Sequence, residues 1–155
     1  MPIAINTGTK NVPLKFAHQL SKLVNKSWES GEFIERTTPV TQDLLRFWFS
    51  ESFTSSRHTN FHGVQKQAIL NTIYVHEIIG NKSVFEMYSN VNDELLAELD
   101  LIELQAYKYS HPKYCIKMAT GTGKTWVMHA LLLWQFLNAK EEETPTNRFS
   151  KNFLL

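Results

Sequence analysis

One stretch decides the fold of this chain: Met118-Ala119-Thr120-Gly121-Thr122-Gly123-Lys124-Thr125. Its two glycines let the backbone turn tightly enough for its N–H groups to point at a polyphosphate. The apolar segment 126–137 follows directly and predicts a helix. The N-terminus of that helix would add free N–H groups and a positive dipole end. A glycine-bearing turn that opens a helix in this way is typical of a phosphate-binding loop.

Each residue of the loop has an expected task. Lys124 is expected to reach the β- and γ-phosphates of a nucleotide, and the Thr125 hydroxyl is expected to bind Mg²⁺. The other expected nucleotide-binding positions are Ala119, Thr120, Gly121, Thr122 and Gly123. The general pattern begins with glycine, whereas this chain has Met118 there. The alternative interpretation is an accidental Gly-Thr-Gly turn at the start of a helix.

The segments around the loop predict an α/β fold. Lys113–Met118 is a short strand candidate, a helix is expected from about Gly123 to Ala139, and Phe149–Leu155 begins another apolar strand. Strand, helix and strand in this order form a βαβ unit with two parallel strands. We therefore expect a helical N-terminal region leading into an incomplete P-loop parallel sheet. Two strands cannot cover the helix, so some of its Leu, Trp and Met side chains should be exposed.

The first half of the chain predicts three helices. Pro13 fits a first helical turn, and apolar residues at helical spacing continue until Gly31 ends the helix. Thr41 is expected to cap a second helix. Val64–Ile79 is expected to form a third helix, closed by Gly80.

The middle of the chain is harder to interpret. Asn81–Asn92 is polar and turn-like. Asp93–Ala106 has apolar residues on one face and acids on the other, which predicts an amphipathic helix. A strand at Leu99–Leu104 is the competing interpretation, and the acids are expected to form a solvated surface.

Composition excludes several classes of protein. With 43% hydrophobic and 20% charged residues, the chain is neither disordered nor fibrous. A net charge of +1 is too small to argue for nucleic-acid binding. Cys115 is the single cysteine, so an internal disulfide is excluded, and its apolar surroundings predict a buried thiol. His58 and His62 lack partners at metal spacing and are expected to be surface or capping histidines.

Two features bear on cellular location. Met1–Val12 lacks the basic start and apolar run of a secretory signal. The apolar segment 126–137 is too short to span a bilayer. The expectation is a cytoplasmic protein with no membrane contact.

The loop resembles motif I of superfamily 2 helicases and translocases, in which a first position other than glycine is familiar. Trp134–Asn138 and Arg148–Asn152 resemble the Res subunit of type III restriction enzymes and related DEAD/DEAH-type restriction proteins. Upstream, Pro39–Trp48 is similar to the helix before the motor core of that family. Phe61–Ala68 is similar to the segment in which a glutamine recognises adenine.

This likeness covers roughly residues 37–79 and 110–155, and it implies a function. Gln65 stands at the glutamine position, where its amide would donate to N7 of adenine and accept from N6–H. The implied cofactors are therefore ATP and Mg²⁺. The implied activity of the family is ATP-driven DNA translocation coupled to cleavage. Its implied partners are DNA and a modification methyltransferase subunit.

The same likeness implies a domain plan. Residues 1–60 would be a helical N-terminal extension, and 61–155 the truncated start of a RecA-like ATP-binding domain with an insertion at 80–109. Hydrolysis in such motors needs an acidic pair and an arginine finger. Glu141–Glu143 is the only acidic run after the loop, and it is expected to be a solvated connection. Lys124 is then the only catalytic residue expected here, so this fragment should not hydrolyse ATP or cut DNA by itself.

Two other functions stay open. A standalone nucleotide-binding or interaction module without hydrolysis would bind MgATP tightly and fold without partners. A different P-loop enzyme, such as a small kinase, would need a lid and a base, and the sequence offers neither.

Overall fold

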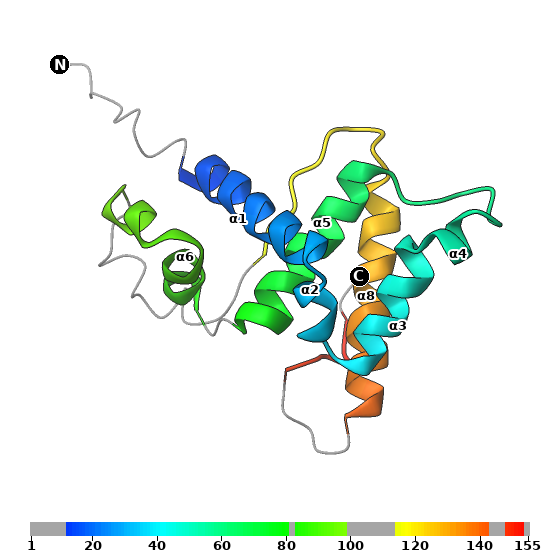
Figure 1. Cartoon of the computed structure of the whole chain (residues 1–155). Helices are drawn as coiled ribbons and strands as arrows, with labels where there is room; N and C mark the ends of the chain where they lie inside the picture. Colours follow the sequence, from blue (N-terminus) through cyan, green and yellow to red (C-terminus); the bar gives the residue numbers. More distant parts are fainter. Residues whose placement is uncertain (1–11, 81–82, 99–113, 143–147, 154–155) are drawn as a thin grey trace.

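The structure is a computed structural model that describes residues 12–80, 83–98, 114–142 and 148–153. Every regular element within these ranges is a helix (Figure 1). In chain order the elements are α1 (Val12–Glu29), α2 (Glu32–Glu35), α3 (Pro39–Phe49), α4 (Glu51–Thr54), α5 (Gly63–Ile73), the π-helix η2 (Tyr74–Ile79), α6 (Val84–Asn92), the 3-10 helix η3 (Asp93–Glu98) and α8 (Lys124–Glu141).

The predicted α/β fold with a parallel sheet is wrong for the described residues, which contain no strand. Residues 114–118, from the first expected strand, have irregular backbone. Residues 148–153 include the start of the second expected strand, and they contain bends instead. The Phe149 ring packs against Trp134 and His76. A strand is stable only beside other strands, and a parallel sheet only when both faces are covered. A short apolar run without such neighbours does not define a strand.

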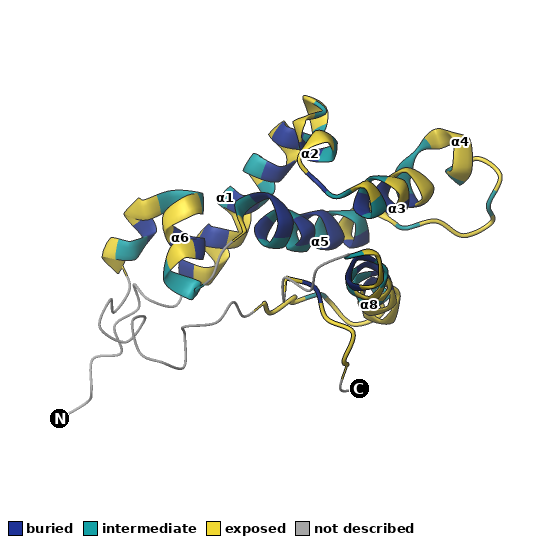
Figure 2. Ribbon diagram, turned by 90° about the horizontal axis from the view of Figure 1, so that it is seen from below, coloured by how far each residue is buried: buried dark blue, intermediate teal, exposed yellow. Residues whose placement is uncertain are grey.

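The described part of the chain is built around α5, which packs against α1 on one side and α8 on the other (Figures 1 and 2). α8 also packs along α3, and α1 along α6. The buried face of α1 carries apolar residues four positions apart: Val12, Phe16, Leu20 and Val24. This spacing places them on one stripe of the helix. The helix agrees with its prediction, but the apolar set from which it was predicted does not match this stripe: Leu20 and Val24 are buried, whereas Leu14 is 71% exposed and Ala17 is exposed.

The outer face of α8 is apolar and exposed, which confirms the expectation of an uncovered helix. Figure 2 shows one side of α8 buried against its neighbours and the other open to solvent. The exposed large side chains on this helix are Trp126, Met128, Leu133 and Phe136.

Most helix ends follow the predicted signals. Gly31, with φ 81°, follows α1, and Gly80, with φ 66°, closes η2. The cap of α3 was predicted wrongly: the Thr38 side chain accepts from the Thr41 N–H, and Pro39 occupies the first turn. Proline suits that position because its missing N–H would have no partner there.

The segment after Gly80 also differs from its prediction. Within Asn81–Asn92, expected to be turn-like, residues Val84–Asn92 form α6, and the Ser83 side chain caps it by accepting from Glu86 N–H. Met87 and Tyr88 are buried on this short helix. Of the predicted amphipathic helix Asp93–Ala106, the described part is the 3-10 helix η3. The competing strand Leu99–Leu104 lies outside the described residues.

A buried polar network ties η2 to α3 and α8. The Glu77 side chain on η2 accepts from the Trp134 indole N–H at 2.6 Å, from the Thr38 N–H at 2.8 Å and from the Thr41 hydroxyl. The Asn138 amide donates to the Thr41 hydroxyl oxygen at 3.0 Å. Because buried polar groups are costly unless paired, this network fixes how the three helices meet.

The last carbonyl groups of η2 are held by two arginines. The Arg148 guanidinium donates to the Glu77 carbonyl at 2.6 Å, and the Arg36 guanidinium donates to the Ile78 carbonyl at 3.2 Å. In return, the His76 Nε2–H donates to the Arg148 carbonyl at 2.7 Å. Arg148 is therefore hydrogen-bonded to η2 and not to a neighbouring strand.

His76 predicts a loss of stability below neutral pH. Burial lowers the pKa of its imidazole and outweighs the hydrogen bond to the Arg148 carbonyl, which raises it. The fold therefore favours neutral His76, whereas the unfolded chain takes up a proton near pH 6.5. The stability that neutral His76 contributes is fully present above pH 6.5. It is lost as the pH falls from 6.5 toward the lowered pKa of His76 in the folded protein. Urea-unfolding midpoints at about pH 7.5 and about pH 5.5 measure the loss.

Two variants separate this effect from general acid sensitivity. His76→Gln removes the titrating group, so the drop between the two pH values should shrink. His129→Gln, at an exposed position of α8, is the matched control and should keep the drop seen in the unchanged protein. An equal drop in all three proteins would rule out His76 as its source.

Candidate functional site

The glycine-bearing loop opens α8 as the sequence predicts. Gly121 has φ 79° and Gly123 has φ 75°, a region that residues with a side chain rarely adopt. Gly123 is the N-cap residue of α8, and no side chain caps the helix there. The Trp126 N–H donates to the Gly123 carbonyl at 3.0 Å, and no side chain caps the N–H groups of Lys124 and Thr125 before it, which suits an anion.

The loop is closed on itself through the Ala119 carbonyl. This oxygen accepts from the Thr122 hydroxyl at 2.6 Å, from the Thr122 N–H at 3.4 Å and from the Lys124 ammonium at 3.1 Å. Lys124 is exposed, so its ammonium can exchange this carbonyl for another acceptor at little cost. A phosphate oxygen is the stronger acceptor because it is charged.

Gln65, near the start of α5, is held against this loop. Its side chain is 3% exposed, and its Nε2 donates to the Thr122 carbonyl at 2.9 Å. Its Oε1 accepts from the His62 N–H, also at 2.9 Å. The side chain lies so close to Gly123 that a Cβ atom there would be 2.2 Å from Nε2. The structure thus brings the predicted base-recognising residue to the predicted phosphate loop.

The Gln65 amide keeps hydrogen-bonding capacity in this arrangement. A primary amide has two N–H donors and two lone pairs on its oxygen. The bonds to Thr122 and His62 use one donor and one lone pair. Because Gln65 is 3% exposed, the remaining donor and lone pair become available to a ligand only when the amide turns toward it.

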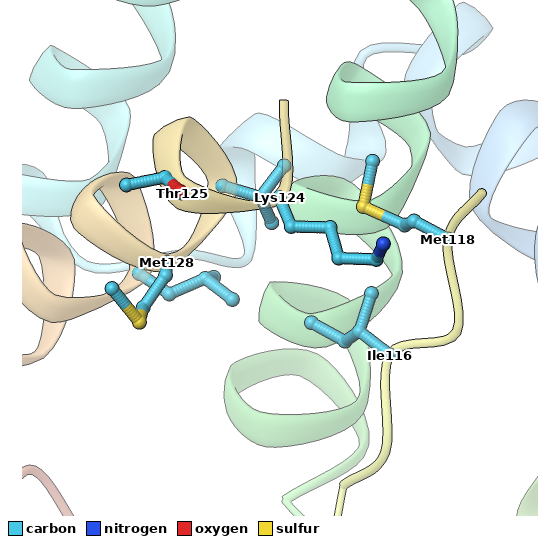
Figure 3. A pocket seen from close by; sticks show the side chains of 7 residues that line it. Ile116, Met118, Lys124, Thr125 and Met128 are labelled. Atoms are coloured by element: carbon cyan, nitrogen blue, oxygen red, sulfur yellow. The ribbon is translucent and has the colours of Figure 1, made fainter. Parts of the chain in front are cut away.

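Thr125 and Lys124 border an apolar cavity beside the loop (Figure 3). The cavity has a volume of about 350 Å³, and Figure 3 shows the Lys124 side chain extending from α8 toward Met118. The full lining is Ile116, Met118, Lys124, Thr125, Val127, Met128 and Leu131. The other five lining residues are apolar, so the polar side-chain groups of this cavity are those of Lys124 and Thr125.

The cysteine and the two histidines considered in the sequence do not join the site. Cys115 is exposed, contrary to the predicted buried thiol, because residues 114–118 do not enter a sheet that would cover them. His58 and His62 are exposed, as expected. Among the described residues, no group of three or more His, Cys, Asp or Glu side chains could hold a metal ion. Nor does any helix in that part of the chain combine the length and apolar character needed to cross a bilayer.

Comparison with known families assigns the chain to a family. A family model described as the type III restriction enzyme Res subunit matches residues 58–154, more than half of the chain. The chain belongs to the Res family. The match contains Gln65, the phosphate loop and α8, and it leaves out α1 to α4. No curated protein and no solved structure matches the chain.

Trp126 lies beside the phosphate loop, and the sequence did not single it out. The sequence predicts only that Trp126 lies in an apolar helix. In the structure Trp126 is 58% exposed and lies next to Gly123. The sequence feature that could have pointed to Trp126 is its position, as a large aromatic residue directly after Gly-Lys-Thr.

Proposed function

We propose that this chain binds MgATP through the phosphate loop and contributes this binding to a DNA-dependent ATPase of a type III-like restriction enzyme. The observation that supports this most strongly is the hydrogen bond from Gln65 to Thr122. It joins two segments that are 57 residues apart in the chain. A nucleotide whose phosphates contact the loop would therefore have its base within reach of an amide suited to adenine.

The proposed binding uses groups that the loop already presents. The Lys124 ammonium turns from the Ala119 carbonyl to the β- and γ-phosphate oxygens. The N–H groups at the start of α8 and the positive end of the helix dipole face the phosphates. The Thr125 hydroxyl supplies one ligand to Mg²⁺, whose other ligands are phosphate oxygens and water.

Binding, rather than hydrolysis, is the activity proposed for these residues. Hydrolysis in P-loop motors needs carboxylates that hold Mg²⁺ and orient the attacking water. The Res family supports DNA and a modification methyltransferase subunit as partners of the whole motor, and the translocation activity is proposed for that assembly. We further propose that the protein works in the cytoplasm, where ATP and DNA meet.

The test is a titration of the 155-residue chain with MgATP by calorimetry. Lys124→Ala should weaken binding by about 100-fold, because the substitution removes charged hydrogen bonds to two phosphates. The side chain is exposed, so the variant should stay folded.

Lys140→Ala is the matched control, since it removes the same charge from the last turn of the same helix. It should bind MgATP as the unchanged protein does. If the unchanged protein fails to bind, or if the two lysine variants bind equally well, the proposed function is wrong.

A further inference from the structure

An exposed tryptophan stands beside the phosphate loop. Trp126 lies in the first turn of α8, directly after Thr125, with 58% of its surface open to solvent. By contrast, Trp48 and Trp134 are buried in the core. A large aromatic side chain left open at a binding loop is more informative than a scattered exposed leucine, because tryptophan is enriched at sites of recognition.

The indole and the Gln65 amide meet at the same glycine. A Cβ atom on Gly123 would lie 2.2 Å from Gln65 Nε2 and 3.7 Å from Trp126 Cδ1. The absence of a side chain at Gly123 thus makes room for the Gln65 amide, and the Trp126 ring lies at ordinary contact distance from the same position. The Gln65 amide offers hydrogen bonds to the edge of a nucleotide base, and the Trp126 indole offers a face on which the base can stack.

The indole is supported from the core by other aromatic rings. Its centroid is 6.4 Å from that of Phe61, and the rings are almost perpendicular at 88°. Phe61 in turn packs against Trp48 and Phe49, with centroids 6.0 Å and 5.8 Å away. Edge-to-face contacts of this kind orient aromatic rings. The position of Trp126 is therefore set by packing as well as by its backbone.

We infer that Trp126 is the stacking surface for the purine base of a nucleoside triphosphate bound at the loop. The inference rests on the proposed function, which supplies the phosphates. It divides recognition between three side chains. Lys124 binds the phosphates, Gln65 binds the edge of the base, and Trp126 binds its face. Stacking depends on the π-surface of the base, so Trp126 adds affinity for purines without distinguishing between them.

The experiment compares two ligands in the presence of Mg²⁺: ATP, and inorganic tripolyphosphate, which has no base. In the 155-residue chain, Trp126→Ala should weaken ATP binding by about tenfold and leave tripolyphosphate binding unchanged. Trp126→Phe keeps an aromatic face and should recover most of the ATP affinity. Phe136→Ala, at an exposed aromatic position of the same helix, is the matched control and should change neither affinity.

Tryptophan fluorescence gives a second readout. Stacking of a base on Trp126 should quench the emission of the unchanged protein when MgATP is added. Trp126→Phe should still bind ATP but lose that quenching, whereas tripolyphosphate should cause none in either protein.

The possible failures are distinguishable. If the unchanged protein binds neither ligand, the proposed function falls, and this inference with it. If Lys124→Ala abolishes binding while Trp126→Ala binds ATP normally, nucleotide binding stands and the stacking role is refuted. If Trp126→Ala weakens ATP and tripolyphosphate equally, the indole only shapes the loop, which also refutes stacking.

Discussion

Replacing Glu77 by alanine is expected to lower the free energy of unfolding by about 4 kcal/mol. The Glu77 carboxylate accepts from three donors: the Trp134 indole N–H, the Thr41 hydroxyl and the Thr38 N–H. Glu77 is 5% exposed, so water cannot readily replace the lost acceptor. The Trp134 N–H also donates to the Thr41 hydroxyl oxygen at 3.0 Å and keeps that acceptor, whereas each donor left buried without a partner costs about 1–3 kcal/mol. Urea unfolding followed by circular dichroism measures the difference.

Two further variants show whether the network is responsible. Glu77→Gln keeps an acceptor oxygen in nearly the same shape and should lose less stability than Glu77→Ala. Glu98→Ala removes an exposed carboxylate that pairs with Lys15 at 2.7 Å, and surface pairs of this kind contribute at most about 1 kcal/mol. A loss in Glu77→Ala no larger than that in Glu98→Ala would mean that the buried network does not stabilise the fold.

Trp134→Ala should have an effect of similar size, about 3–5 kcal/mol. Its side chain is among the largest that are fully buried, with 2% exposure. It packs edge-on against His76 and Phe149, with centroids 5.1 Å and 5.8 Å away, and donates its N–H to Glu77. The substitution removes this packing, leaves a cavity and takes one donor from the carboxylate. Thermal and urea unfolding of the same preparations measure the loss.

The contributions of packing and hydrogen bonding can be separated on this helix. Trp134→Phe keeps ring contacts but has no N–H, so it should be less damaging than Trp134→Ala. Phe136→Ala, two residues away and 43% exposed, should cost about 1 kcal/mol or less. Because Trp134 and Glu77 share a hydrogen bond, the double alanine variant should lose less than the two single losses combined. Strict additivity would argue against their coupling.

Part of the candidate site can be predicted from neighbouring residues alone. Gly121 and Gly123 adopt the positive φ values that the loop requires, and α8 begins at Lys124. These features depend on residues close together in the chain. The predicted cap at Thr41 failed for a local reason too: Pro39 at the first helical position already points to Thr38 as the cap.

The errors in the predicted secondary structure have causes that involve distant parts of the chain. The segments near Met118 and Phe149 were predicted as strands from short apolar runs. A strand, however, exists only when another lies beside it. In the structure Phe149 packs on Trp134 instead. The polar composition of Asn81–Asn92 likewise concealed α6, whose buried face consists only of Met87 and Tyr88.

The sequence by itself determined the tight turn at Gly121 and Gly123, the start of α8, the helical nature of α1 and membership of the Res family. Backbone restrictions and helical periodicity belong to neighbouring residues, and the chain carries them wherever it folds. Only the tertiary structure decided that Gln65 contacts Thr122, that Glu77 is buried under Trp134 and that Trp126 lies open beside Gly123. The first two contacts join separate segments of the chain, and the exposure of Trp126 depends on what packs around α8. Such contacts form only when the burial of the whole core compensates the entropy lost in bringing distant segments together.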